Sequence, residues 1–183
     1  DTMAIIGDNK PQWVIAEFAC MAAGGIPTGA YPDSLAEEME YLITFSDARF
    51  LVVRDQEQVD KMLAIWDTIR EKVETIIVWD SRGMSHYYDE YPFMGRFETV
   101  LEKGAQAETD QPNFVAEAAE AIDPNAPAVM LTTSGTTAKP KLSILSHRNL
   151  IFACDNFSIV IPAEKDDEIL SAAPLPWIGE QMF

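Results

Sequence analysis

Basic residues are scarce in this sequence. Its 13 Lys and Arg residues stand against 30 Asp and Glu residues, which gives a formal net charge of -17 at pH 7. Binding to nucleic acid without sequence preference requires an excess of Lys and Arg, and docking on anionic lipid through a basic patch requires the same. The charge therefore argues against both functions and predicts no nucleic-acid partner. It does not exclude a nucleotide site that supplies its own cations and hydrogen-bond donors.

Cysteine and long apolar runs are also rare. The two cysteines, Cys20 and Cys154, each lie in an apolar helical pattern, and no close Cys/His spacing suggests zinc. We expect two buried thiols in a reducing compartment, and therefore a cytoplasmic protein. No apolar run approaches the ~20 residues that span a bilayer, and the opening residues lack the basic region of a signal peptide. Because the chain opens on Asp1 and its last residues carry no stop signal, we also expect a piece of a longer chain.

Short apolar runs alternate with amphipathic stretches along the chain. The apolar runs predict strands at 3–7, 26–31, 49–55, 74–80, 126–133, 141–146 and 167–175. The amphipathic stretches predict helices at 8–25, 34–47, 57–72, 97–106, 113–122 and 147–161, whereas residues 81–96 are predicted to be irregular. Ser34 and Glu37 predict a capping box, and Ser146 followed by His147 predicts another helix start. Together these elements indicate an α/β fold with a largely parallel sheet and helices on both faces.

The stretch LTTSGTTAKPKLSILSH, residues 131–147, lies between two of the predicted strands. Five of its six residues at positions 132–137 are Ser or Thr, and the sixth is Gly135. Small residues with a glycine let backbone N–H groups converge on an anion, and hydroxyl groups add further donors. Lys139 and Lys141 add positive charge, and Pro140 stiffens the chain between them. This mixture is what a polyphosphate requires, although a plain hairpin loop rich in Ser, Thr and Gly could have the same composition.

Two familiar phosphate loops do not fit this stretch. A Walker A loop needs Gly-Lys-Ser/Thr at the start of a helix, but here Ala138 precedes Lys139, Pro140 precedes Lys141, and a strand follows. The glycine-rich loop of kinases needs several glycines, and only one is present in the stretch.

The order Thr-Ser-Gly-Thr-Thr-x-x-Pro-Lys, followed by Ser-His, resembles the signature of adenylate-forming enzymes. This family includes acyl-CoA synthetases, amino-acid-adenylating domains and luciferases. Residues 7–53 resemble the N-terminal part of the same family, and LSAAPLPWIGEQ (170–181) resembles the motif after its phosphate loop, in a form closest to bacterial long-chain fatty-acyl-CoA synthetases. The resemblance implies that residues 1–183 are an incomplete N-terminal portion of the AMP-binding domain, without the remainder of that domain or the C-terminal domain.

The resemblance also implies a reaction and its site residues. ATP activates a carboxylic acid, here a long-chain fatty acid, as acyl-AMP, and coenzyme A then forms the thioester. The contacts with the ATP phosphates are implied for residues of the loop: Thr133, Ser134, Gly135, Thr136, Thr137 and Lys141. Thr136 is the one candidate for Mg²⁺, and no catalytic residue is assigned. Trp177 is either part of the carboxylate or acyl pocket or an ordinary half-buried aromatic.

The resemblance leaves several alternatives open. The acceptor could be a carrier protein in place of CoA, and a peripheral membrane contact of the full-length protein stays open. Many members have Gly at the positions of Ala138 and Leu142, so a non-catalytic nucleotide- or acyl-binding remnant is a further alternative. Neither difference removes a hydrogen-bond donor from the loop. Because most of the family's machinery is not within residues 1–183, we expect this stretch alone to be inactive.

Overall fold

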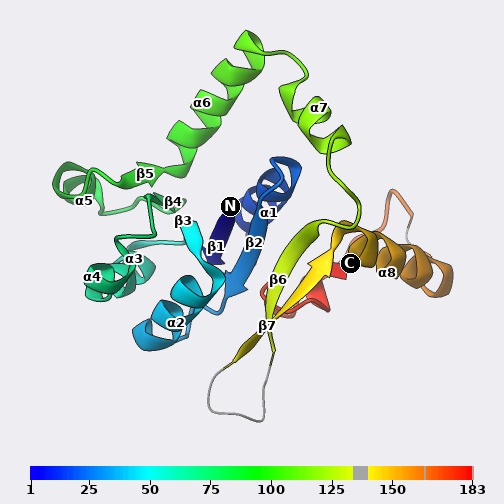
Figure 1. The fold of residues 1–183 in the computed structure, drawn as a ribbon, viewed down its shortest axis with the longest axis horizontal. Coiled ribbons are helices and arrows are strands. Elements are labelled where there is room, and N and C mark those ends of the chain that lie inside the picture. Colours follow the sequence, from blue (N-terminus) through cyan, green and yellow to red (C-terminus); the bar gives the residue numbers. More distant parts are fainter. Residues whose placement is uncertain (134–139, 163, 183) are drawn as a thin grey trace.

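A seven-stranded sheet organises the chain in the computed structural model, which describes residues 1–133, 140–162 and 164–182. Its strand order is β5-β4-β3-β1-β2-β6-β7 (Figure 1). Neighbouring strands pair in parallel, except that β6 and β7 form an antiparallel hairpin, so the predicted largely parallel sheet is confirmed. The strands are β1 (Thr2–Ile6), β2 (Ile26–Ala30), β3 (Ala48–Val53), β4 (Thr75–Val78), β5 (Met94–Arg96), β6 (Pro127–Thr133) and β7 (Lys141–Ser146).

Helices separate the successive parallel strands and follow the last strand, and the helices before residue 70 pack on the sheet. They are α1 (Pro11–Ala22), α2 (Ala36–Ser46), α3 (Gln56–Ala64), α4 (Trp66–Ile69), α5 (Ser85–Glu90), α6 (Phe97–Asp110), α7 (Phe114–Glu120) and α8 (His147–Val160), with a short 3₁₀ helix η1 (Glu180–Met182). Figure 1 shows α6 and α7 extending away from the sheet. No helix in the described part of the chain is both long and apolar enough to cross a bilayer.

The alternation of side chains along the central strands builds two cores. In β1, Ala4 and Ile6 face one core and Ile5 faces the other. The larger core contains side chains of α2 and α3, such as Met39 and Val59, whereas the other contains side chains of α1. Successive strand residues point to opposite faces, so both faces of these strands are buried. The predicted cover of helices on both faces is therefore confirmed.

Several expectations about helices are corrected. The single helix expected at 57–72 is divided into α3 and α4, because Ile65 between them leaves helical geometry, with φ -110° and ψ 9°. The capping box of Ser34 and Glu37 does not form, because the chain turns first, with the Ser34 N–H donating to the Tyr31 carbonyl. The helix starts one residue later, where the Leu35 N–H donates to the Glu38 carboxylate at 2.9 Å.

Three further expectations are wrong. Residues 167–175 are not a strand, because their backbone pairs with no strand of the described sheet. Residues 81–96 are not irregular throughout, since they contain α5 and β5. Cys20 is buried as expected, but Cys154 is exposed, because it lies on α8, which buries none of its residues against the described chain.

Candidate functional site

The carboxyl ends of the parallel strands gather at one edge of the sheet. In Figure 1, β2 and β6 run toward the lower edge of the view, where β6 ends and β7 begins. The loops that follow β1, β2, β3 and β6 therefore emerge on the same side, because these strands are parallel. In open α/β sheets, ligands bind in the crevice outside the carboxyl ends of the strands. This edge is the candidate functional site.

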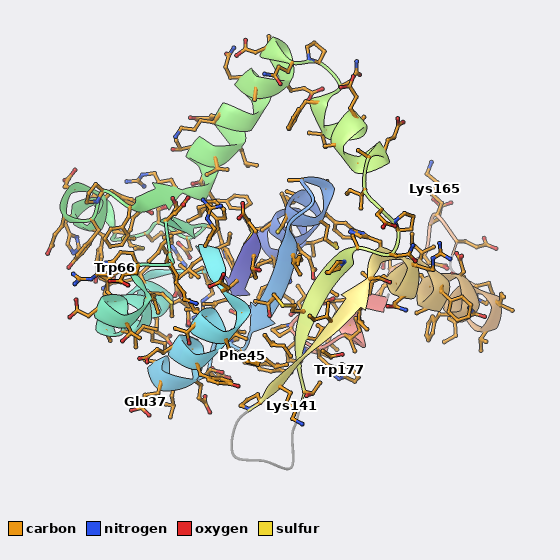
Figure 2. All side chains as sticks on the ribbon, viewed as in Figure 1. Glu37, Phe45, Trp66, Lys141, Lys165 and Trp177 are labelled. Carbon is orange, nitrogen blue, oxygen red and sulfur yellow. The ribbon has the colours of Figure 1, made fainter. Side chains whose placement is uncertain are left out.

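Two of the residues predicted to contact phosphate lie where the strands β6 and β7 meet the loop of their hairpin. Thr133 lies opposite Lys141 in the antiparallel register, and its hydroxyl donates to the Lys141 carbonyl at 3.3 Å. The Tyr41 hydroxyl of α2 donates to the Pro140 carbonyl at 3.0 Å, which fixes the entry to β7. Both Thr133 and Lys141 are exposed, and Figure 2 labels Lys141 beside the end of the hairpin strands. The structure thus brings these two residues together with their side chains accessible.

The remaining predicted contacts, Ser134, Gly135, Thr136 and Thr137, lie outside the described residues. The proposed magnesium contact, Thr136, is among them. Within the described ranges, no group of three His, Cys, Asp or Glu side chains is arranged to hold a metal ion. Mg²⁺ in proteins is commonly held by one or two carboxylates together with substrate phosphates. An ion held mainly by the phosphates of ATP does not require such a group.

Trp177 lies on a loop that is attached to the sheet at the same edge. Its side chain is 55% exposed, so part of the indole is accessible, and this exposure is compatible with both predicted alternatives. The backbone N–H of Trp177 donates to the Pro174 carbonyl at 2.9 Å, which closes a tight turn. The indole lies over Gly179, where a Cβ atom would come within 2.5 Å of the ring. The glycine at position 179 therefore leaves room for the ring beside this turn.

Sequence reasoning did not assign a role to Asn9, although it lies in the G-D-N stretch that carries part of the resemblance. The side-chain amide of Asn9 donates to the Ser171 hydroxyl and to the Ala173 carbonyl, at 2.6 and 2.7 Å. Its side-chain oxygen accepts the Leu175 N–H at 3.0 Å. These contacts join residues more than 160 positions apart, so a local pattern gives no signal for them. The motif itself is the only hint that the sequence offers.

A second group of charged residues lies outside the ends of β1, β3 and β4. Arg54 pairs there with Asp8, Asp55 and Glu57, and Arg82 pairs with Asp80. The Arg82 side chain also lowers the pKa of Asp80 by donating hydrogen bonds to it. An open cavity of about 480 Å³ is lined by Asp8, Arg54, Asp55, Asp80, Arg82 and neighbouring residues. Both arginines of this cavity pair with carboxylates, so they offer little uncompensated positive charge to an anion.

The sheet and the hydroxyl-rich hairpin agree with the adenylate-forming class of enzymes. The sequence matches the family described as AMP-binding enzyme over residues 1–183, so the chain belongs to that family. This membership supports the resemblance stated from the motifs.

Individual relatives point in the same direction. The long-chain-fatty-acid–CoA ligase ACSBG1 of Homo sapiens is 30% identical over 190 residues, which cover 100% of this chain and 25% of that protein. The ligase heimdall of Drosophila melanogaster is 28% identical over 184 residues, covering 100% and 26%. The structure of the long-chain-fatty-acid-CoA ligase FadD1 from Archaeoglobus fulgidus shares the fold, with a TM-score of 0.69 and 18% identity, covering 100% of this chain and 32% of that one. The chain therefore spans about a quarter of the length of these curated relatives.

Proposed function

We propose that the protein containing this chain activates a long-chain fatty acid with ATP and transfers the acyl group to coenzyme A. One observation carries the proposal: the hydroxyl-rich loop joins Thr133 to Lys141 at the carboxyl edge of the sheet, in a member of the AMP-binding family. The match to long-chain-fatty-acid–CoA ligases along the whole chain supports the choice of acid and acceptor.

The proposed reaction has two steps. A carboxylate oxygen of the fatty acid attacks the α-phosphorus of ATP, and the bond from that phosphorus to the bridging oxygen of pyrophosphate breaks. The sulfur of CoA then attacks the acyl carbonyl carbon, the bond to AMP breaks, and the thiol proton is released. In the first step, negative charge moves onto the departing pyrophosphate. Hydrogen-bond donors and a cation placed around that charge stabilise the transition state.

The chain would supply these groups from the β6–β7 hairpin. Backbone N–H and hydroxyl groups of the residues at 133–137 would donate to the phosphate oxygens, and the Lys141 ammonium would balance their charge. Magnesium would enter with ATP, with Thr136 as the only contact assigned to it from this chain. Trp177 would border the pocket for the carboxylic acid. We further propose a cytoplasmic location, and a peripheral contact with the membrane that supplies the fatty acid.

The test is ATP–pyrophosphate exchange by the full-length protein with carboxylic acids of graded chain length. The expected result is exchange that requires an acid and is fastest with long acyl chains. Thioester formation is then measured with CoA and, in parallel, with a phosphopantetheinylated carrier protein. Preference for the carrier protein would replace the CoA assignment. Absence of exchange with every acid would overturn the enzyme assignment and favour a non-catalytic binding protein.

A further inference from the structure

Every donor and the acceptor of the Asn9 side-chain amide bond to a loop that lies far away in the sequence. Both N–H groups donate, one to the Ser171 hydroxyl at 2.6 Å and one to the Ala173 carbonyl at 2.7 Å. The amide oxygen accepts the Leu175 N–H at 3.0 Å. The orientation of the amide is fixed by these partners, since a carbonyl only accepts and a backbone N–H only donates. An aspartate, a serine or an alanine at this position could not make all three bonds.

The residue itself is firmly placed in the fold. Asn9 lies between β1 and α1, two residues before Pro11, the first residue of that helix. The Trp13 N–H donates to the Lys10 carbonyl at 3.0 Å, which closes the first turn next to Asn9. The Trp13 side chain is 1% exposed and lies in the same core as Leu175. Asn9 therefore connects a rigid part of the molecule to the loop.

The held loop has no strand pairing within the described sheet, so it depends on such attachments. Pro176 packs directly on Gly29 of β2, where a Cβ atom would come within 2.8 Å of the proline Cα. Inside the loop, the Glu180 carboxylate accepts the Ala173 N–H at 3.0 Å, and the Gln181 amide donates to the Leu175 carbonyl at 2.7 Å. Ala173 and Leu175 are thus bonded from Asn9 on one side and from η1 on the other.

This arrangement determines the position of the exposed Trp177 indole. It follows Leu175 and Pro176, the two residues that anchor the loop on the core and on β2. A displacement of the anchored segment must therefore move the indole, because Trp177 directly follows Pro176 and only Pro176 separates it from Leu175. The hydrogen bonds of Asn9 lie on the segment that enters this turn.

We propose that Asn9 is a positioning residue that fixes the segment 171–177 and thereby places Trp177 against the carboxylic acid. This inference rests on the proposed function, in which Trp177 borders the acid pocket. Asn9 acts through the loop and has no contact with ATP, because the phosphate contacts belong to the β6–β7 hairpin. Its loss should therefore affect the acid much more than the nucleotide.

The experiment measures steady-state kinetics of the full-length protein with Asn9→Ala, Asn9→Asp and a matched control, Asn125→Ala. Asn125 is exposed, and among the described residues its side chain donates to Asp123 in its own turn. For Asn9→Ala we expect the KM for the fatty acid to rise roughly tenfold, while the KM for ATP stays within about twofold. Asn9→Asp retains the acceptor for Leu175 but places a carboxylate next to the Ala173 carbonyl, so we expect it not to restore the KM.

A purely structural role for Asn9 gives a different result. In that case the melting temperature would fall while both KM values changed by less than twofold, or the two values would rise equally. Either outcome overturns the proposal. A double-mutant cycle with Ser171→Ala adds a second criterion. If the two residues act through the same contact, the effect of the pair on the acid KM is smaller than the product of the single effects, and independent effects contradict the proposal.

Hydrogen exchange tests the attachment of the segment 171–177 to Asn9 independently of the proposed enzyme activity. If the wild-type protein shows no ATP–pyrophosphate exchange with any acid, the proposed function fails, but the loop can still be examined. Asn9→Ala should accelerate exchange of the backbone amides of Ala173, Leu175 and Trp177, and Asn125→Ala should leave it unchanged. Unchanged protection of these amides in Asn9→Ala would show that Asn9 does not fix the segment 171–177, whatever the protein catalyses.

Discussion

At the scale of single residues, Lys141 places a positive charge at the start of β7, next to the loop of the β6–β7 hairpin. Replacing it with alanine should lower kcat/KM for ATP by roughly 10- to 100-fold, because hydrogen bonds to charged groups contribute about 1.5–3 kcal/mol. The measurement is pyrophosphate exchange at varied ATP concentration in the full-length protein. Lys103→Ala, on the exposed face of α6, is the control and should leave the rate unaltered. An unchanged ATP dependence in Lys141→Ala would remove this residue from phosphate binding.

Glu17 is a buried carboxyl group in α1 and is 6% exposed. Burial raises its pKa from the ordinary value of 4.5 to about 7, and the neighbouring Trp13 indole opposes this shift. That indole N–H has no hydrogen-bond partner of ordinary geometry within the described residues, and burial determines the direction of the shift. The protonated form is therefore favoured in the folded protein.

The raised pKa of Glu17 sets a pH dependence of stability. Below pH 4.5 the carboxyl is protonated in both the folded and the unfolded state. Between pH 4.5 and 7 only the unfolded chain loses the proton, so the free energy of unfolding falls as the pH rises, by about 3 kcal/mol in total at 1.36 kcal/mol per pH unit. Glu17→Gln removes this loss. We expect its stability relative to wild type to increase from pH 5 to pH 8.

Chemical denaturation at several pH values, followed by circular dichroism, measures this change. Glu102→Gln in α6 is the control, because that side chain is exposed and should show no such trend. A difference between Glu17→Gln and wild type that is the same at pH 5 and pH 8 would contradict the assignment of the raised pKa to Glu17.

At the scale of elements, the start of α8 is defined by a reciprocal cap. The Ser146 hydroxyl accepts the Asn149 N–H at 3.2 Å, and the Asn149 side chain accepts the Ser146 N–H at 3.0 Å. Ser146→Ala should therefore lower the free energy of unfolding by about 1 kcal/mol. Ser158→Ala is the matched control, since that hydroxyl only donates to the Cys154 carbonyl within the helix. Equal effects of the two substitutions in thermal or urea unfolding would show that the cap contributes nothing specific.

The same scale shows how much of the fold could be predicted. Strands β1, β3 and β4 were predictable because each is a short apolar run with turn residues at its ends. The run at 167–175 has the same appearance, yet Ile169 and Leu170 are 57% and 87% exposed, and the segment after them bonds to Asn9. Local pattern cannot distinguish a strand from an apolar loop whose partner lies far away in the sequence. The order of hydroxyl groups at 133–137 is local, so a phosphate role could be proposed from the sequence and stays a prediction, whereas the contact of Asn9 could not be predicted.

At the scale of the whole molecule, many apolar side chains of the described chain face solvent. On α8, Ile151, Phe152, Ile159 and Val160 are 59%, 68%, 79% and 78% exposed. Large apolar side chains exposed together on one helix are typical of an interface. The chain spans about a quarter of the length of its curated relatives, so we expect the rest of a full-length protein to cover α8.

Residues 1–183 expressed alone should therefore bind a hydrophobic dye and self-associate, and the full-length protein should do neither. Phe152→Ser with Ile159→Ser should reduce both properties in the isolated stretch. Dye fluorescence and light scattering provide the measurements, and Val100→Ser with Leu101→Ser on α6 provides a comparison. These α6 residues are 42% and 50% exposed, so they test whether α8 matters more than apolar exposure in general. Equal reductions from the two pairs would contradict a specific interface on α8.

The same argument predicts that residues 1–183 alone do not convert fatty acid, ATP and CoA into acyl-CoA and AMP. The hairpin would offer donors and a lysine to the phosphates, but Lys141 and Trp177 are open to solvent in this part of the chain. Stabilisation of a developing pyrophosphate charge requires a site from which water is largely excluded, because exposed charges are screened. Chromatographic assay of AMP and thioester, with the full-length protein as the positive control, measures the difference. Turnover by residues 1–183 at a rate within tenfold of the full-length protein would show that the site is complete within this chain.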